Sequence, residues 1–148
     1  MRVHIATDHA AFELKEYLVA KLAEAGHDVV DHGAPSYDAL DDYPDFIVPC
    51  AEAVADEDGI GIVLGGSGNG EQIMANKVKG VRAILAYNTD IARLGREHNN
   101  ANVISLGGRM QPLEDAWAMV EAFLGTPFSG DERHARRIAK VSAYEDAN

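Results

Sequence analysis

The stretch of residues 60–77 constrains the fold of this chain more than any other part of its sequence. A short apolar run, suited to a buried strand, leads into a segment rich in glycine: Gly65, Gly66, Gly68 and Gly70. The residues that follow can form a helix. This order of strand, glycine loop and helix points backbone N–H groups at an anion, and the missing Cβ atoms let the anion come close. The segment therefore predicts an oxyanion or phosphate cradle at the end of a buried strand.

Three well-known loop signatures do not match this segment. A P-loop requires Lys and then Ser or Thr after its last glycine, whereas Gly70 is followed by Glu71 and Gln72. The spacing also differs from that of a dinucleotide loop, and Asn69 stands where a nucleophile elbow around Ser67 would need glycine. The segment therefore fits a general anion-binding cradle with a carboxylate, Glu71, at the N-terminus of the helix that follows. The alternative is a tight turn in which the helix dipole alone favours Glu71.

Length and composition describe an ordinary globular chain. The 148 residues, 47% hydrophobic and 25% charged, suffice for a single domain, residues 1–148, with a proper core. The net charge of −11 argues against binding to nucleic acid or to an anionic membrane surface. The one cysteine, Cys50, excludes an internal disulfide, and neither a signal segment nor a membrane-spanning stretch is apparent. A cytoplasmic location is the resulting expectation.

Hydrophobic periodicity predicts alternating strands and helices. Strands are expected at residues 3–6, 28–32, 60–64, 81–86 and 102–106. Helices are expected after residue 9 to about residue 25, and at residues 46–55, 71–77, 89–97, 114–124 and about 131–145. This alternation predicts an α/β fold: a single Rossmann-like, three-layer α/β/α domain with a five-stranded parallel sheet, right-handed crossovers and a further C-terminal helix.

The sequence pattern assigns a structural rather than a functional role to residues of the first helix and to three histidines. The first helix should pack inward through three leucines spaced four residues apart, namely Leu14, Leu18 and Leu22. Its charged residues, among them Lys15, should face water. Three histidines show no metal-ligand spacing and are expected at the surface or at strand edges: His4, His27 and His32.

In an open parallel sheet, ligands bind beyond the carboxyl ends of the strands. That rule brings Asp8 and His9, the glycine loop, and Arg109 after the fifth strand to one edge. The long loop at residues 34–44, which includes Tyr43, has a length that is often functional and could shape the rim of a pocket. A histidine, an arginine and a cradle at one edge predict a site for an anionic ligand.

Two polar groups do not fit this edge. A helix that follows a strand runs back toward the opposite edge, so His98 and Asn99 should lie far from the cradle of their own chain. Arg133 and Arg137 lie one turn apart on the last helix of an acidic chain. The plain alternatives are a helix cap and surface ion pairs. If the groups are functional, a partner subunit supplies at least His98, which predicts a homodimer with shared sites and leaves a tetramer open.

Six short motifs occur along the chain: residues 8–10 (DHA), 42–44 (DYP), 65–71 (GGSGNGE), 75–77 (ANK), 96–100 (REHNN) and 107–109 (GGR). Together they resemble the type B ribose-5-phosphate isomerases, a family that includes the galactose-6-phosphate isomerase subunits. The resemblance covers nearly the whole chain, and the combination of motifs is highly specific. It implies reversible conversion of a phosphorylated pentose, ribose 5-phosphate, to ribulose 5-phosphate, without a metal or a cofactor.

The resemblance also implies roles for individual residues. Glu71 resembles the base that moves a proton between C1 and C2, and His98 resembles the acid that opens the sugar ring. The backbone of residues 66–70 resembles the hole for the enediolate oxygen. Many relatives carry a cysteine base in place of Ser67, which is too weakly acidic for that task but belongs to the same catalytic loop. The implied substrate contacts are Asp8, His9, Tyr43, Gly66, Ser67, Gly68, Asn69, Gly70, Asn99, Arg109, Arg133 and Arg137.

Two rival functions remain open at this point. One is isomerisation of a six-carbon sugar phosphate, of the galactose- or allose-6-phosphate type, with pocket length set by the loop at residues 34–43. The other is a non-catalytic phosphate- or nucleotide-binding module, against which stand Glu71 at the cradle and the missing nucleotide signatures. We expect Glu71 to be a carboxylate at pH 7, but the direction of its pKa shift is open, because the helix N-terminus favours the charged form whereas burial would raise the pKa.

Overall fold

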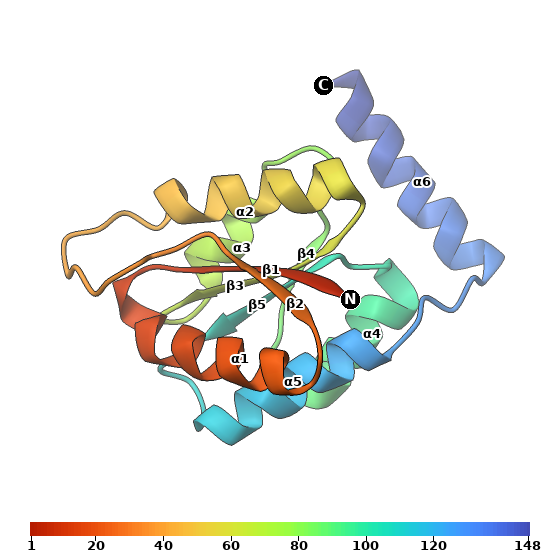
Figure 1. Ribbon diagram of the computed structural model, residues 1–148. Coiled ribbons are helices and arrows are strands. Elements are labelled where there is room, and N and C mark those ends of the chain that lie inside the picture. The colour runs from red at the N-terminus through yellow and green to blue at the C-terminus, as the bar shows by residue number, and fades with distance from the viewer.

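The computed structural model describes all 148 residues and places a parallel sheet of five strands at the centre of the molecule (Figure 1). The strands are β1 (Arg2–Thr7), β2 (Asp28–Asp31), β3 (Ile60–Gly65), β4 (Ala83–Leu85) and β5 (Val103–Gly107). Their order across the sheet is β2-β1-β3-β5-β4. The chain runs outward from β1 to β2 and then returns to β3 on the other side of β1. A topological switch point, where open α/β sheets bind ligands, therefore lies between β1 and β3.

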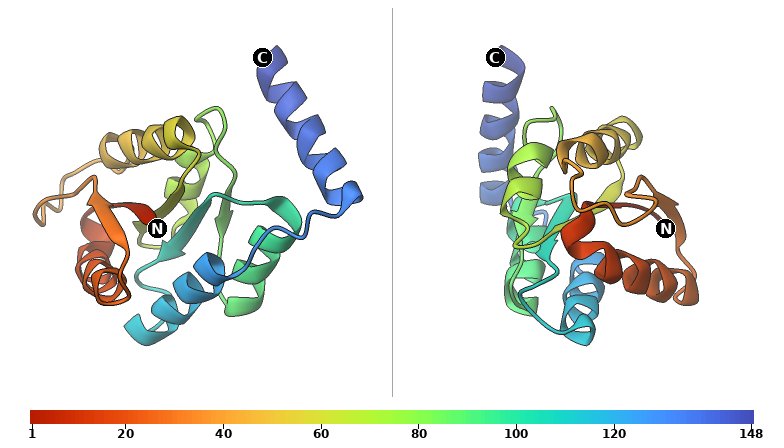
Figure 2. Two further views of the ribbon diagram at one scale, coloured as in Figure 1. Left: turned by 45° about the vertical axis from the view of Figure 1, so that its right-hand side comes forward. Right: turned by 90° about the vertical axis from the view of Figure 1, so that its left-hand side faces the viewer.

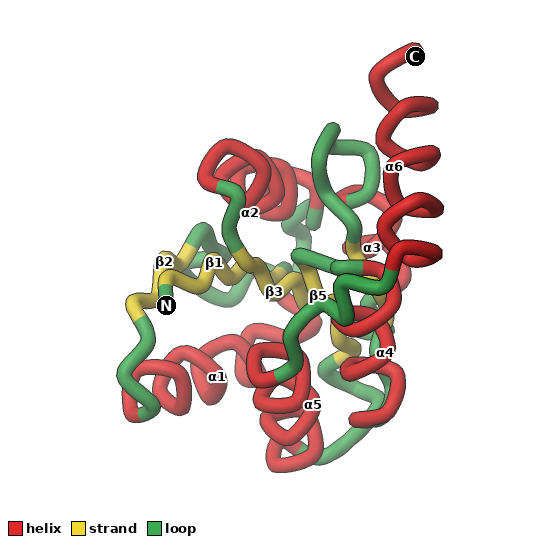
Figure 3. The backbone as a smooth tube through the Cα atoms, turned by 90° about the vertical axis from the view of Figure 1, so that its right-hand side faces the viewer, coloured by secondary structure: helices red, strands yellow, loops and turns green.

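Helices cover both faces of the sheet (Figures 2 and 3). They are α1 (Phe12–Glu24), α2 (Pro44–Glu57), α3 (Asn69–Ala75), α4 (Thr89–Asn99), α5 (Leu113–Gly125) and α6 (Glu132–Ala147), with a short 3₁₀ turn, η1 (His9–Ala11), before α1. Helices α1, α4 and α5 pack on one face, and α2 and α3 pack on the other. The predicted three-layer α/β/α fold is confirmed, and the element ends differ from prediction by only a few residues. No helix combines the length and the apolar character needed to cross a membrane.

Alternation along the strands divides the core into two layers. Val3 and Ile5 of β1 face α1 and α5, whereas Ala6 of the same strand faces α2. The predicted apolar stripe of α1 is confirmed, because its three leucines are buried against the first layer: Leu14, Leu18 and Leu22. Burial of each such side chain contributes about 1.5–3 kcal/mol. The tight packing of both layers fixes the carboxyl edge of the sheet on which the candidate site is built.

Two buried polar side chains contradict the sequence predictions. Lys15 does not face water: it is 1% exposed and donates hydrogen bonds of 2.7 Å to Asp31 and to a backbone carbonyl of the loop after β2. His4 is also not at the surface, being 2% exposed, and it hydrogen bonds to His32 at 2.8 Å and to Glu57 at 2.6 Å. In both cases, partners from distant parts of the chain satisfy a polar group that periodicity alone would place outside.

Helix α6 stands apart from the layers and projects beyond the body of the molecule (Figures 1 and 2). Near its start, the ring of His134 lies over that of His98 at the end of α4, with centroids 4.4 Å apart. Near its end, Glu145 accepts a 2.8 Å hydrogen bond from a backbone amide in the loop between α3 and β4. Val141 and Tyr144 are 60% and 73% exposed. The helix thus leaves part of its apolar side uncovered.

Candidate active site

The carboxyl ends of β1, β3 and β5 lie side by side because the three strands pair in register. Thr7 pairs with Leu64, which in turn pairs with Leu106. The loops that follow are tied together, since the amides of the loop after β5 donate to carbonyl oxygens of the glycine loop at 2.7 and 3.1 Å. This edge therefore brings together the predicted group from three loops, namely Asp8 and His9, residues 66–71, and Arg109.

The carboxylate of Glu71 lies against the backbone of Gly65. A Cβ atom at Gly65 would overlap this carboxylate, so glycine makes room for the acid. Glu71 is 4% exposed although it belongs to the first turn of α3. Burial raises the pKa of the Glu71 carboxyl group, a hydrogen bond from its own backbone amide opposes this effect, and the nearby Asp8 carboxylate raises the pKa further. Burial thus outweighs the backbone hydrogen bond, and the net shift of the Glu71 pKa is upward.

The glycine loop keeps most of its backbone amides free. Four of them donate to no acceptor within the protein: those of Gly66, Ser67, Gly68 and Gly70. The loop is held in place through other atoms, because Ser105 of β5 donates a 2.7 Å hydrogen bond to the carbonyl oxygen of Gly68. Gly68 also has a φ of +89°, which would strain any residue with a side chain. Fixed donors with no partner of their own are what an oxyanion hole requires.

Three predicted contact residues line this loop. Ser67 and Asn69 are exposed, and the Ser67 hydroxyl oxygen accepts a 3.2 Å hydrogen bond from the Asn69 amide at the start of α3. Tyr43 comes from the loop before α2, and its ring covers Gly70, where a Cβ atom would approach the ring to 2.8 Å. The phenol and the two polar side chains therefore stand beside the free amides.

His9 and Arg109 bring positive charge to the same edge. A Cβ atom at Gly66 would lie 3.3 Å from Arg109 Nη1, so the guanidinium runs along the glycine loop. His9 Nδ1 lies 2.7 Å from Asp41 Oδ1. The largest effect on the pKa of His9 is this hydrogen bond, which raises it. Partial desolvation and the Arg109 charge lower the pKa, whereas the Asp8 charge raises it. The net result is a raised pKa for His9. A histidine with a raised pKa and a guanidinium beside free amides form a site suited to a phosphate dianion.

Asp8, His9 and Asp41 form a compact polar cluster at this edge. One side-chain nitrogen or oxygen atom of each lies within 4.8 Å of the others. The hydrogen bond between His9 and Asp41 engages one such atom of each, and Asp8 accepts a 2.9 Å hydrogen bond from the Ala10 amide. Asp41 is the residue of this site that the sequence motifs did not identify. Its only sequence signal was its position in the long loop before Tyr43.

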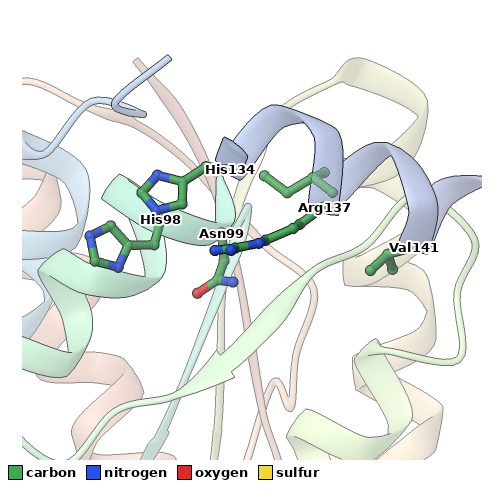
Figure 4. A pocket seen from close by; sticks show the side chains of 6 residues that line it. His98, Asn99, His134, Arg137 and Val141 are labelled. Atoms are coloured by element: carbon green, nitrogen blue, oxygen red, sulfur yellow. The ribbon is translucent and has the colours of Figure 1, made fainter. Parts of the chain in front are cut away.

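The remaining predicted residues lie elsewhere on the chain. His98 and Asn99 end α4 beside the start of β5, whereas the cradle is at the other end of that strand. Five strand residues correspond to about 17 Å. Arg137 of α6 points toward Asn99, and with His98 and His134 these side chains line a cavity of about 290 Å³ (Figure 4). Arg133 lies one turn before Arg137 on the same helix. One chain thus carries two separate groups of predicted site residues.

Comparisons with known proteins point to one family. The family model described as Ribose/Galactose Isomerase matches residues 3–141. The ribose-5-phosphate isomerase B of Mycolicibacterium paratuberculosis is 55% identical over 146 residues, which cover 98% of this chain and 92% of the relative. The solved structure of the Clostridium thermocellum ribose-5-phosphate isomerase B matches with a TM-score of 0.95 at 39% identity, covering 99% of both chains. The Mycoplasma genitalium ribose-5-phosphate isomerase B with bound ribulose 5-phosphate matches with a TM-score of 0.96 at 39% identity, covering 99% of this chain and 97% of that one.

Proposed function

Because this chain belongs to the ribose/galactose isomerase family, we propose that it interconverts ribose 5-phosphate and ribulose 5-phosphate through a cis-enediolate. The observation that carries the proposal is the position of Glu71, a buried carboxylate with a raised pKa next to a loop of free amides. Removal of a proton next to a carbonyl group needs a positioned base and a stabilised oxyanion. The glycine loop and Glu71 offer both at one edge of the sheet.

Glu71 is the base in this mechanism. Its carboxylate takes the proton from C2 of the open-chain aldose, the C2–H electron pair forms the C1–C2 double bond, and O1 becomes the enediolate oxygen. A proton then passes from the C2 hydroxyl group to O1, and protonated Glu71 returns its proton to C1, so that C2 becomes the carbonyl carbon. The raised pKa of Glu71 suits an acid that must both accept and return a proton.

The free amides of residues 66–70 stabilise the enediolate oxygen in this scheme. Loss of a single oxyanion donor typically costs about 3 kcal/mol of transition-state stabilisation. Gly68 and Ser105 hold the loop rigid through a hydrogen bond of 2.7 Å, so little reorganisation is needed during the reaction. Ser67 and Asn69 face solvent on the same loop, where they can contact sugar hydroxyl groups.

His9 and Arg109 bind the substrate phosphate in this scheme. Both lie at the cradle edge, and the His9 pKa is raised by its hydrogen bond to Asp41, which favours the charged imidazole. The guanidinium fork matches phosphate oxygens, and charge-assisted hydrogen bonds are stronger than neutral ones. Local positive charge of this kind is needed on a chain whose net charge is −11.

A partner subunit supplies the second half of the site in the proposed enzyme. His98 opens the sugar ring, Asn99 contacts the sugar, and Arg133 and Arg137 complete the phosphate site. Three observations support a homodimer with shared sites: the strand-length separation of the two groups, the uncovered apolar side of α6, and the fact that no cradle residue lines a cavity of the single chain. The whole chain then acts as one isomerase domain, with α6 packed on the partner.

Relative turnover of sugar phosphates tests the proposed function against its closest rival. The matching family model names galactose as well as ribose, and the tip of the 34–44 loop is open, with Leu40 89% exposed. We expect a higher kcat/KM for ribose 5-phosphate than for galactose 6-phosphate or allose 6-phosphate. A Glu71→Gln preparation, purified identically, controls for contaminating isomerases. Preference for a six-carbon substrate would replace the proposal, and absence of turnover with all three would favour a binding module.

A further inference from the structure

We propose that Asp41 is a positioning residue of the isomerase site, which orients His9 and keeps its imidazole charged for the substrate phosphate. Asp41 can have this role only if the proposed function is right, because that function places the phosphate at His9. The residue lies in the loop between β2 and α2, outside the motifs that carry the family resemblance. It touches no atom that reacts and would act only through His9.

Asp41 fixes both the ring and the backbone of His9 with one oxygen atom. Oδ1 lies 2.7 Å from Nδ1 of the ring and accepts a 3.2 Å hydrogen bond from the His9 amide. Because a carboxylate only accepts hydrogen bonds, the Nδ1 atom must carry a proton in this pair. The other ring nitrogen, Nε2, is therefore the one left to face a ligand.

The second oxygen of Asp41 shows that the carboxylate does more than anchor its loop. Oδ2 is buried and has no hydrogen-bond partner, and the Asp41 side chain is only 7% exposed. Burial of a charged group with an unpaired oxygen is costly, so a loop anchor would be better served by a neutral asparagine. The charge is compensated only if the neighbouring imidazole is itself charged. The pair thus favours an imidazolium at His9.

The other groups around His9 do not replace Asp41. From β1, the Asp8 charge raises the pKa of His9, whereas from the loop after β5 the Arg109 charge lowers it, as does partial desolvation. The ring of Tyr37 meets the imidazole edge-on, with centroids 6.1 Å apart, and it supplies no carboxylate to the pair. Without Asp41, desolvation and the Arg109 charge would lower the pKa of His9, and only the Asp8 charge would raise it. The imidazole would then lose its proton at a lower pH.

Kinetics of Asp41→Asn, with Asp38→Asn as the matched control, test this role. Asp38 lies in the same loop and is exposed, and its side chain accepts a hydrogen bond only from the nearby Leu40 amide. At a pH above the ordinary imidazole pKa of 6.5, we expect Asp41→Asn to raise KM for ribose 5-phosphate about tenfold, with kcat within about twofold of wild type. At a pH low enough to protonate the imidazole in both proteins, the rise should be much smaller.

The pH dependence separates positioning from a merely structural role. Each KM is expressed relative to wild type at the same pH, which cancels titration of the substrate phosphate, and Asp38→Asn should match wild type throughout. An equal rise in KM at both pH values would show that Asp41 only holds its loop in place and does not control the charge of His9, which would overturn the proposal. An unchanged KM would also overturn it.

A titration of the histidine NMR signals tests the pair without any turnover. The His9 signal is assigned from its loss in His9→Gln, and its pKa should lie above 6.5 in wild type and fall in Asp41→Asn. A wild-type value at or below 6.5 would overturn the proposal even if Asp41→Asn failed to fold. A raised value in a protein that does not isomerise ribose 5-phosphate would keep the Asp41–His9 pair and reject the proposed function instead.

Discussion

The carboxylate of Glu71 occupies the space that a side chain on Gly65 would need. Gly65 is the last residue of β3, and its φ is not in the left-handed region, so glycine is required there for space rather than for backbone conformation. The pair joins the end of the strand to the first turn of α3 and holds a buried acid beside the free amides. The chemistry that we propose depends on this contact between strand and helix.

Gly65→Ala should separate folding from catalysis. The three atoms nearest to the added methyl group would all belong to the far end of the flexible Glu71 side chain, so the fold should survive with a melting temperature within a few degrees of wild type. The displaced carboxylate should lower kcat about 100-fold, since a shift of about 1 Å at a reacting group can have that effect. Steady-state kinetics measure the loss. Gly125→Ala is the control, because its methyl group would meet nothing within 4 Å, and wild-type kcat in Gly65→Ala would contradict the expectation.

Glu71→Gln should change stability in a pH-dependent way. Because burial raises the pKa of Glu71 in the folded protein, wild-type stability falls as pH rises from the ordinary value of 4.5 through the raised value. Glutamine carries no charge, so the variant should melt a few degrees above wild type at about pH 8, with the difference vanishing below about pH 4. Thermal unfolding followed by circular dichroism checks this, and exposed Glu52→Gln should show no such trend. A variant less stable than wild type at about pH 8 would count against a buried, destabilised carboxylate.

The cradle could be predicted from the sequence because it follows from chain direction and local residue types. Four glycines after an apolar run and an acid in the next turn are adjacent in the sequence, so their contacts are local. The separation of His98 from Glu71 could also be predicted, since a helix that follows a parallel strand must run back across the sheet. No long-range contact had to be known for either conclusion.

What the sequence could not predict depends on partners that are distant along the chain. The sequence pattern places Lys15 at the surface, but in the structure it is buried and paired with Asp31 of β2. His4 is likewise buried and paired with Glu57 of α2. Asp41 belongs to no recognisable motif, and only its 2.7 Å contact with His9 in the structure indicates a role for it. Hydrophobic periodicity reports which side of an element is buried, but not which polar groups meet there.

Mixed dimers should recover the activity that two inactive variants lack. If each site takes Glu71 from one subunit and His98 from the other, a heterodimer of Glu71→Gln and His98→Ala contains one intact site and one doubly altered site. Random pairing of equal amounts should then restore about a quarter of wild-type activity after unfolding and refolding together. The assay is turnover of ribose 5-phosphate by the mixture. Activity no higher than the mean of the two separate variants would show that each chain builds its own site.

Arg137→Ala should weaken substrate binding more than turnover. In the proposed dimer, Arg137 contacts the phosphate, which is remote from the reacting carbons and is held alike in ground state and transition state. We expect KM to rise about tenfold with kcat little changed. Arg136→Ala is the matched control on the same helix, because Arg136 pairs with Glu132 at 3.0 Å on the surface. A fall in kcat with KM unchanged would argue against a phosphate contact.

The fate of deuterium at C2 of the substrate tests the central claim most directly. Ribose 5-phosphate deuterated at C2 is followed by NMR in ordinary water with wild type and with Glu71→Gln, alongside a binding measurement for each protein. Wild type should remove the deuterium from C2 as ribulose 5-phosphate forms, whereas Glu71→Gln should bind the sugar phosphate with similar affinity and leave the deuterium in place. Loss of deuterium from C2 at the wild-type rate in Glu71→Gln would contradict the assignment of Glu71 as the base.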